Sequence, residues 1–183
     1  TEIRIVRKLG NELLGTRSIS ASPPTVSNVE IVDATDPVSG TVTLEWQASD
    51  PDGDDLRYDV YYTDDGGITY AAYALALSET SVALDTTQMG GSNLARFRVT
   101  ANDGTRTAEA ESANFTMASK PPMVLILTPQ DGLEVTYGTQ VNFMAEVEDL
   151  QGDMPEASME WWLNGASTGV NGPNYTAYLL PVG

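Results

Sequence analysis

Apolar and polar residues alternate with a period of two along much of the chain. The pattern is clearest over residues 42–49, where apolar side chains occupy every even position, and it recurs over residues 56–62 and 97–101. Successive side chains of a strand point to opposite faces of a sheet, so this pattern predicts strands with one buried face. Helical periodicity is essentially missing. We therefore expect an all-β protein.

Gly-Gly, Asp-Gly and Ser-Gly pairs separate the strand candidates in the first two thirds of the chain, and such pairs are typical of turns. The other candidates there are residues 25–34, 68–77, 81–86 and 106–117. Later candidates are residues 123–128, 141–147, 159–163 and 175–180. Their short, even spacing favours a β-sandwich over a parallel sheet with helices.

A motif of two prolines, an alternating strand and an acidic loop occurs twice in the chain. The first prolines of the two copies, Pro23 and Pro121, are 98 positions apart. A repeat of this length in a strand-rich sequence predicts tandem copies of one small β-sandwich. We assign the first sandwich to residues 21–120 and the second to residues 121–183, joined by a Pro-Pro linker.

The second copy is shorter than the first. Aligned on the repeat, residues 121–183 have no counterparts of the strands at 95–101 and 106–117, so the second sandwich is expected to be incomplete. An incomplete sandwich leaves an open sheet edge. Two interpretations are open: the chain is a segment of a longer protein, or another copy of the chain supplies a strand, as in donor-strand filaments.

Residues 1–20 predict a β-hairpin that precedes the first linker. Two strand-like runs flank Gly10 and Asn11, a pair that suits a two-residue turn with positive φ angles. An isolated hairpin is marginally stable in water. We expect it either to close a preceding domain or to pack on the first sandwich.

Charge narrows the possible partners. The chain has 26 acidic and 9 basic residues, a net charge of -17, and the excess of acid lies after residue 22. Such a surface repels nucleic acids and anionic membranes. No apolar run approaches the ~18 residues of a membrane-spanning helix, so neither nucleic-acid binding nor membrane insertion is expected.

The chain contains no cysteine and no histidine. This excludes disulfides, a thiolate nucleophile, a Cys/His zinc site and a histidine base. The many carboxylates define no fixed acid–base pair in a cleft, and the serines have no partner for a triad. We therefore expect no enzymatic activity from this chain.

Seven short strands, a tryptophan on the second and no cysteine pair resemble a fibronectin type III-like or immunoglobulin-like sandwich. More narrowly, residues 46–58, 62–67 and 98–104 are similar to tandem modules of large bacterial or archaeal secreted and surface proteins. Modules of this family occur in adhesins, in surface-layer and filament proteins, and as spacers attached to secreted hydrolases. The resemblance implies an extracellular or cell-surface structural or adhesion module whose partners are neighbouring modules. Alternatives are an accessory module of a secreted hydrolase and a carbohydrate-binding module.

Aspartates cluster in the loop that follows the second strand. Alternate aspartates can converge on Ca²⁺, which takes six to eight oxygen ligands. In a sandwich the loop before the last strand lies at the same end, beside the first linker, and the second copy repeats the arrangement beside Lys120. The candidate calcium ligands are Asp50, Asp52, Asp54, Asp55, Asp103, Asp149 and Asp153. An EF-hand is excluded, because position twelve is Tyr61 and no helices flank the loop.

A second interpretation of the acidic loop stays open. Asp side chains commonly accept hydrogen bonds from backbone N–H groups of their own turn, and this alone would explain an Asp-Pro-Asp-Gly-Asp sequence.

Aromatic residues suggest a contact surface. Trp161 and Trp162 are adjacent on a predicted strand, so one ring points inward and the other outward. We assign Trp161 to the core and Trp162 to the outer face, where it would be covered by other parts of the protein or contact a glycan or a partner module. Tyr61, Tyr70 and Tyr73 make a weaker case for a sugar-binding face.

Residues 63–70 resemble the Asp-box hairpin, Ser/Thr-x-Asp-x-Gly-x-Thr-Trp, with Tyr70 in the last place. In sialidases this motif fixes a turn away from the catalytic centre. We expect a structural role for it here.

Overall fold

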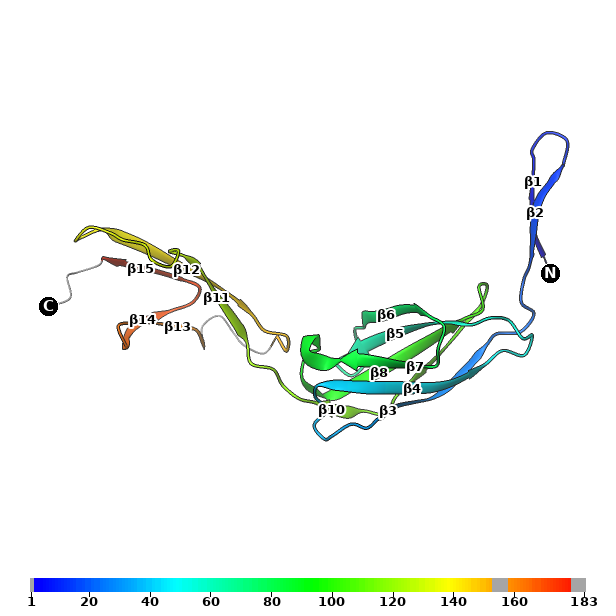
Figure 1. Cartoon of the computed structure of the whole chain (residues 1–183), viewed down its shortest axis with the longest axis horizontal. Helices are drawn as coiled ribbons and strands as arrows, with labels where there is room; N and C mark the ends of the chain where they lie inside the picture. The colour runs from blue at the N-terminus through cyan, green and yellow to red at the C-terminus, as the bar shows by residue number, and fades with distance from the viewer. Residues whose placement is uncertain (1, 153–157, 179–183) are drawn as a thin grey trace. The chain divides into compact units, whose positions relative to one another are not determined.

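The structure of the protein is a computed structural model that describes residues 2–152 and 158–178 (Figure 1). It divides into two compact units, unit 1 (Thr1–Ala118) and unit 2 (Ser119–Gly183). Both units are built mainly from strands, and unit 1 also contains a single 3₁₀ turn, η1 (Thr86–Gln88). The predicted all-β class is confirmed. No helix in the described part of the chain is long and apolar enough to cross a membrane.

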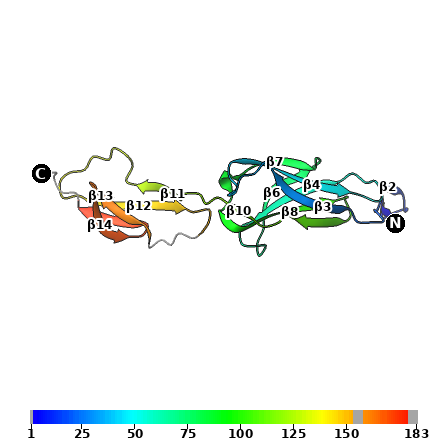
Figure 2. The same ribbon diagram turned by 90° about the horizontal axis from the view of Figure 1, so that it is seen from below.

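Unit 1 contains a sandwich of two antiparallel sheets (Figures 1 and 2). The smaller sheet has the strand order β3-β4-β7, and the larger has the order β10-β8-β5-β6 with β9 also paired to β8. The strands are β3 (Thr25–Val32), β4 (Thr41–Ser49), β5 (Arg57–Thr63), β6 (Ala71–Leu77), β7 (Ser81–Asp85), β8 (Ser92–Asn102), β9 (Thr107–Glu111) and β10 (Phe115–Met117). Strand β6 is the fourth strand of the sandwich and pairs with β5, the third. In a constant-type immunoglobulin domain the fourth strand belongs to the opposite sheet.

The core of unit 1 forms where the alternating strands face one another. Leu44 of β4 and Phe97 of β8 are fully buried. Trp46 packs edge-on against Tyr58 with ring centroids 5.3 Å apart, and Phe97 stacks on Phe115 at 5.4 Å. Such aromatic contacts add to the free energy gained by burying apolar area. The period-two prediction for β4, β5 and β8 is confirmed.

The predicted strand at 106–117 is wrong in one respect, because it is broken into β9 and β10. Ser112 lies at the break and is buried. Its hydroxyl accepts a hydrogen bond from the Phe97 amide at 3.0 Å, and its own amide donates to the Phe97 carbonyl at 2.9 Å. The long strand β8 changes partner at this point, pairing with β10 before Phe97 and with β9 after it.

The predicted hairpin is present as β1 (Glu2–Val6) and β2 (Leu13–Ser18). Its turn is longer than the predicted two residues, because the Arg7 amide donates to the Glu12 carbonyl at 2.8 Å and encloses four residues. Gly10 and Asn11 do have positive φ angles, 92° and 52°. A bulge between Ile5 and Val6 accompanies the longer loop.

Unit 2 consists of a three-stranded sheet with the order β11-β12-β15 and a β13-β14 hairpin. The strands are β11 (Met123–Thr128), β12 (Gln140–Glu148), β13 (Glu160–Leu163), β14 (Ala166–Asn171) and β15 (Asn174–Tyr178). Their order and pairing match β3 to β7 of unit 1 one for one. The described residues of unit 2 contain no counterpart of β8, β9 or β10.

Strand β14 is absent from the sequence-based prediction. Its small and polar residues do not alternate in polarity. It pairs with β13 through a two-residue turn in which Asn164 and Gly165 have φ angles of 52° and 78°. Positive φ at both positions suits the twist of a tight hairpin, and the Asn-Gly pair is the signal that reveals the strand.

Candidate metal centre

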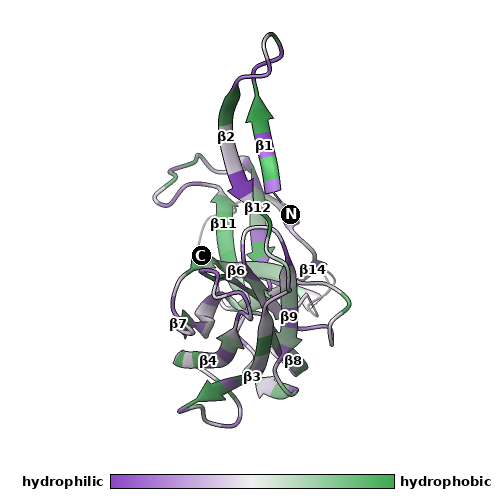
Figure 3. Ribbon diagram, turned by 90° about the vertical axis from the view of Figure 1, so that its right-hand side faces the viewer, coloured by the Kyte–Doolittle hydropathy of each residue, from purple (hydrophilic) through white to green (hydrophobic). Residues whose placement is uncertain are grey.

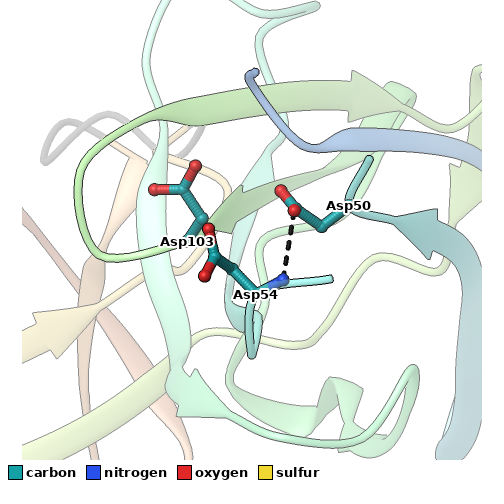
Figure 4. A group of neighbouring side chains, drawn as sticks. All are labelled: Asp50, Asp54 and Asp103. Atoms are coloured by element: carbon teal, nitrogen blue, oxygen red, sulfur yellow. Dashed lines mark hydrogen bonds between the residues drawn. The ribbon is translucent and has the colours of Figure 1, made fainter. Parts of the chain in front are cut away.

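Three of the predicted calcium ligands meet at one end of the unit 1 sandwich (Figure 4). Asp50 directly follows β4, Asp54 lies four residues later in the same loop, and Asp103 directly follows β8. One carboxylate oxygen from each residue lies within 4.8 Å of those of the other two. The loop after β4 of one sheet thus lies beside the loop after β8 of the other sheet, as the order of strands in a sandwich predicts for Asp50 and Asp103.

The two oxygens of Asp50 have different roles. Oδ1 accepts hydrogen bonds from the amides of Asp52 at 2.8 Å and Asp54 at 3.1 Å, which close the turn. Oδ2 is buried and has no hydrogen-bond partner. The tight-turn interpretation therefore accounts for one oxygen of Asp50 and does not account for the other.

The two carboxylate oxygens of Asp103 also have different roles. Asp103 is buried, with only 7% of its surface exposed. Its Oδ1 accepts hydrogen bonds from the Thr105 amide at 2.7 Å, the Thr105 hydroxyl at 2.9 Å and the Arg106 amide at 2.7 Å. Its Oδ2 is buried without a partner. Burial by itself raises the pKa of Asp103, but the hydrogen bonds from Arg106 and Thr105 together hold it below its usual range. Asp103 is therefore charged at neutral pH.

The electrostatics of this group favour a bound cation. Three carboxylates lie close together, and no ion pair in the described part of the chain involves any of them. Like charges at this separation repel one another unless a cation lies between them. Carboxylate oxygens are the ligands that hard cations take, and Ca²⁺ completes its six to eight ligands with carbonyl groups and water.

Asp52 lies in the same loop and binds the linker. Its Oδ2 accepts hydrogen bonds from the Ser20 hydroxyl at 2.8 Å and the Ser22 amide at 2.7 Å. The Ser22 amide is the main reason that the pKa of Asp52 is lowered. Arg106 adds a bond from Nε to the Ser20 carbonyl at 3.1 Å. Sequence reasoning missed these linker contacts, because neither serine belongs to a motif.

Asp55 is exposed and does not belong to the group of three carboxylates.

In unit 2, Gln151 holds the linker in the way that Asp52 does in unit 1. Its side chain accepts from the Lys120 amide at 3.2 Å and donates to the Lys120 carbonyl at 2.7 Å. Asp149 Oδ1 accepts from the Gln151 amide at 3.2 Å, as Asp50 does from Asp52. Asp153 lies outside the described residues, so a second calcium site stays a prediction.

The aromatic residues suggested as contact sites lie in different environments. Trp162 is 62% exposed and donates from Nε1 to Glu160 at 2.8 Å. Arg98 lies over the rings of Tyr61 and Tyr70, at 5.2 and 3.9 Å from their centroids.

The third tyrosine, Tyr73, donates its hydroxyl to the Asp85 carbonyl. All three tyrosines are half-buried. They are therefore engaged in contacts within unit 1, and a sugar-binding face stays a prediction.

Asp65 fixes the β5–β6 loop, in agreement with a structural role for the Asp-box-like sequence. Its Oδ1 accepts from the Thr63 hydroxyl at 2.7 Å and the Ile68 amide at 2.9 Å, and its Oδ2 accepts from the Thr69 amide at 2.9 Å and hydroxyl at 2.6 Å. The Thr69 and Thr63 bonds hold the pKa of Asp65 far below its usual range.

No family model and no curated protein matches the sequence. A solved structure described as "Structural basis for Dscam isoform specificity" aligns with 99% of this chain at 13% sequence identity and a TM-score of 0.35. This chain spans 47% of that chain's length. Because the likeness is so distant, the description of the fold rests on the strand order of the two units.

Proposed function

We propose that the protein is a non-enzymatic extracellular module that spaces or scaffolds within a larger surface protein, and that Ca²⁺ stiffens unit 1 beside its linker. The observation that carries the calcium part is the pair of buried, unpartnered oxygens on Asp50 and Asp103, which lie together with a carboxylate oxygen of Asp54. Two buried carboxylate oxygens without hydrogen-bond donors, in a group of three carboxylates, favour a positively charged ligand.

The mechanism is mechanical. An ion at this site links the loop after β4 to the loop after β8 and so ties the two sheets together at one end. The loop after β4 also holds the linker through Asp52, whose carboxylate bonds Ser20 and Ser22. Restricting the loop therefore restricts the linker, and the direction in which the chain enters the sandwich of unit 1 becomes fixed.

Composition supports the scaffold part of the proposal. The net charge of -17 makes neighbouring modules repel one another and keeps an array of them soluble. Calcium sites of extracellular modules have dissociation constants of about 10⁻⁴–10⁻³ M, which matches the calcium level outside cells better than that inside them.

The test is thermal unfolding with and without calcium. In 10 mM CaCl₂ we expect the melting temperature of unit 1 to rise by about 5 °C relative to EDTA, from binding linkage for a millimolar site. Asp103→Asn removes a ligand charge at the site and should abolish the rise.

Asp52→Asn is the matched control, since it removes an equal charge from the same end of unit 1 but not from the ligand group. It should leave the calcium-dependent rise intact. An identical melting temperature in calcium and EDTA for the parent protein, or a full rise in Asp103→Asn, would show that the site does not bind calcium.

A further inference from the structure

The inward face of unit 2 is open in the described structure. Among the residues of β12 that point inward, Val141 is buried, but Phe143, Ala145 and Val147 are only half-buried. Phe143 contacts Trp161 and Tyr175 at centroid distances of 5.8 and 5.5 Å. In unit 1 the equivalent strand β4 has Leu44 and Trp46 almost fully buried. Unit 1 achieves this with β8, whose inward residues complete the core.

Strand β11 shows the same exposure in unit 2. Its residues from Met123 to Leu127 are all apolar and are 41–64% exposed, so Figure 3 shows the strand as hydrophobic along its length. In unit 1 the equivalent strand β3 contacts β8 and β9, and Val29 is only 6% exposed there. A contiguous run of exposed apolar side chains of this kind is typical of a site of association.

The hairpin β1–β2 has the features of the strands that would cover this face. Ile3 and Ile5 lie on one face of β1 and are 53% and 64% exposed, while Glu2 and Arg4 pair on the other face, where Thr16 also bonds Glu2. Figure 3 shows β1 with alternating hydrophobic and hydrophilic bands.

The same alternation occurs in β8. Phe97 and Val99 point inward and Arg98 points outward, where its guanidinium pairs with Glu109. The Ile-Arg-Ile sequence of β1 thus matches the Phe-Arg-Val sequence of β8 in both polarity and spacing.

The position of the hairpin within the repeat agrees with this match. Phe97 lies 24 residues before Pro121, and Ile3 lies 20 residues before Pro23. The hairpin therefore precedes the first linker in the same way that β8 and β9 precede the second linker. Its separation from the linker is four residues shorter.

Charge complements the shape. Residues 1–22 carry four basic and two acidic side chains, whereas residues 121–183 carry eight acidic side chains and no lysine or arginine. Opposite net charges favour encounter between the hairpin and unit 2, and disfavour pairing between two copies of unit 2.

We infer that the β1–β2 hairpin of one copy of the chain completes unit 2 of a second copy by strand addition. In unit 1, β8 pairs with the free edge of β5, with Val99 opposite Val60. β13 is the counterpart of β5 and pairs with β14 alone among the described residues. β1 adds to the free edge of β13 and places its isoleucines over Trp161, in the way that main-chain hydrogen bonds and alternate side chains direct strand addition.

This contact is heterologous, because the donor surface and the acceptor surface differ. It joins copies head to tail, into open chains or closed rings. Copies that exchange hairpins reciprocally form a dimer through the same two surfaces.

The experiment is sedimentation of the full chain in EDTA, so that the result is independent of calcium. The mean mass of the parent should increase between about 1 and 100 µM. Ile3→Asp/Ile5→Asp should weaken the association by about 100-fold or more, as expected when two central apolar contacts are lost. Thr16→Asp/Ser18→Asp is the matched control, since it changes the charge of the hairpin equally but on its polar face, and it should associate at least ~10-fold more tightly than the isoleucine variant.

A mixing experiment identifies donor and acceptor. Leu163→Asp damages the acceptor face of unit 2 and leaves the hairpin intact, so alone it should be monomeric. Mixed with Ile3→Asp/Ile5→Asp it should give a one-to-one dimer and nothing larger.

A parent that stays monomeric at 100 µM would overturn the inference and show that another segment or protein covers unit 2. Oligomers unaffected by the isoleucine substitutions, or the absence of the mixed dimer, would show that the copies associate through a different surface.

Discussion

Strands β4 and β12 occupy equivalent positions in the two units, yet their inward-pointing side chains are buried to different extents. β4 alternates strictly, and β12 does so except at Met144, which is apolar and points outward. β4 pairs with β3 and β7, and β12 pairs with the equivalent strands β11 and β15. Leu44 is completely buried, whereas its counterpart Phe143 is half-buried. Alternation thus determines which face of a strand points inward, and the opposite sheet determines how far water is excluded from that face.

The largest expected effect tests this difference directly. Leu44→Ala should reduce the free energy of unfolding of unit 1 by about 3 kcal/mol, because it leaves a cavity in a closed core. Phe143→Ala removes a larger side chain but should cost unit 2 no more than about 1 kcal/mol in dilute solution, because the site is already partly solvated. Urea unfolding followed by residue-level hydrogen exchange separates the two units. Equal losses in both units would contradict the open core of unit 2.

A smaller effect is expected from the pH dependence of stability, which should differ between the loop after β5 and the loop after β13. Unit 1 holds its loop through Asp65, whose pKa is lowered, whereas unit 2 uses the uncharged Asn164-Gly165 turn. A lowered pKa in the folded state gives stability that is present above the unfolded pKa of about 3.9 and is lost as the pH falls below it. The melting temperature of unit 1 should therefore fall between pH 5 and pH 2.

Asp65→Asn is the variant that tests this assignment. It should lower the melting temperature at pH 7 and make the decline toward pH 2 shallower, as measured by circular dichroism. A variant with the same acid profile as the parent would place the pH dependence on other carboxylates.

The smallest effect concerns the two linker contacts. Asp52→Ala should accelerate hydrogen exchange at the Ser22 amide, and Gln151→Ala should do the same at Lys120, because each amide loses its acceptor. Neither change should shift the melting temperature by more than about 2 °C, since both side chains lie at the surface. Unchanged exchange at both amides would mean that the linkers are held by other contacts.

Sequence reasoning succeeded where a local pattern carries the information. Alternation identified β4, β5 and β8, and the 98-residue repeat identified the acidic loops beside the linkers. Asp103 was placed near Asp50 by topology alone, although more than fifty residues separate them. These inferences depend on the period of a strand and on the layout of a sandwich, which the sequence expresses directly.

Other features depend on contacts that no pattern reports. The break at Ser112 exists because its side chain binds the backbone of β8. Asp52 and Asp54 look equivalent in the sequence, yet one binds the linker and the other joins Asp50. Which way a side chain turns in a short loop is decided by the nearest donors, and those are known only once the chain has folded.

The use of Asp52 at one linker and Gln151 at the other has a consequence for how an array of such modules responds to its surroundings. A carboxylate only accepts hydrogen bonds and weakens as an acceptor when it gains a proton, so the joint at Ser22 loosens in strong acid. An amide both donates and accepts and has no proton to gain, and Gln151 binds both backbone groups of Lys120. The two linkers are therefore expected to respond differently to strong acid: the direct contact to the linker weakens at Ser22, where a carboxylate makes it, and less so at Lys120, where an amide makes it.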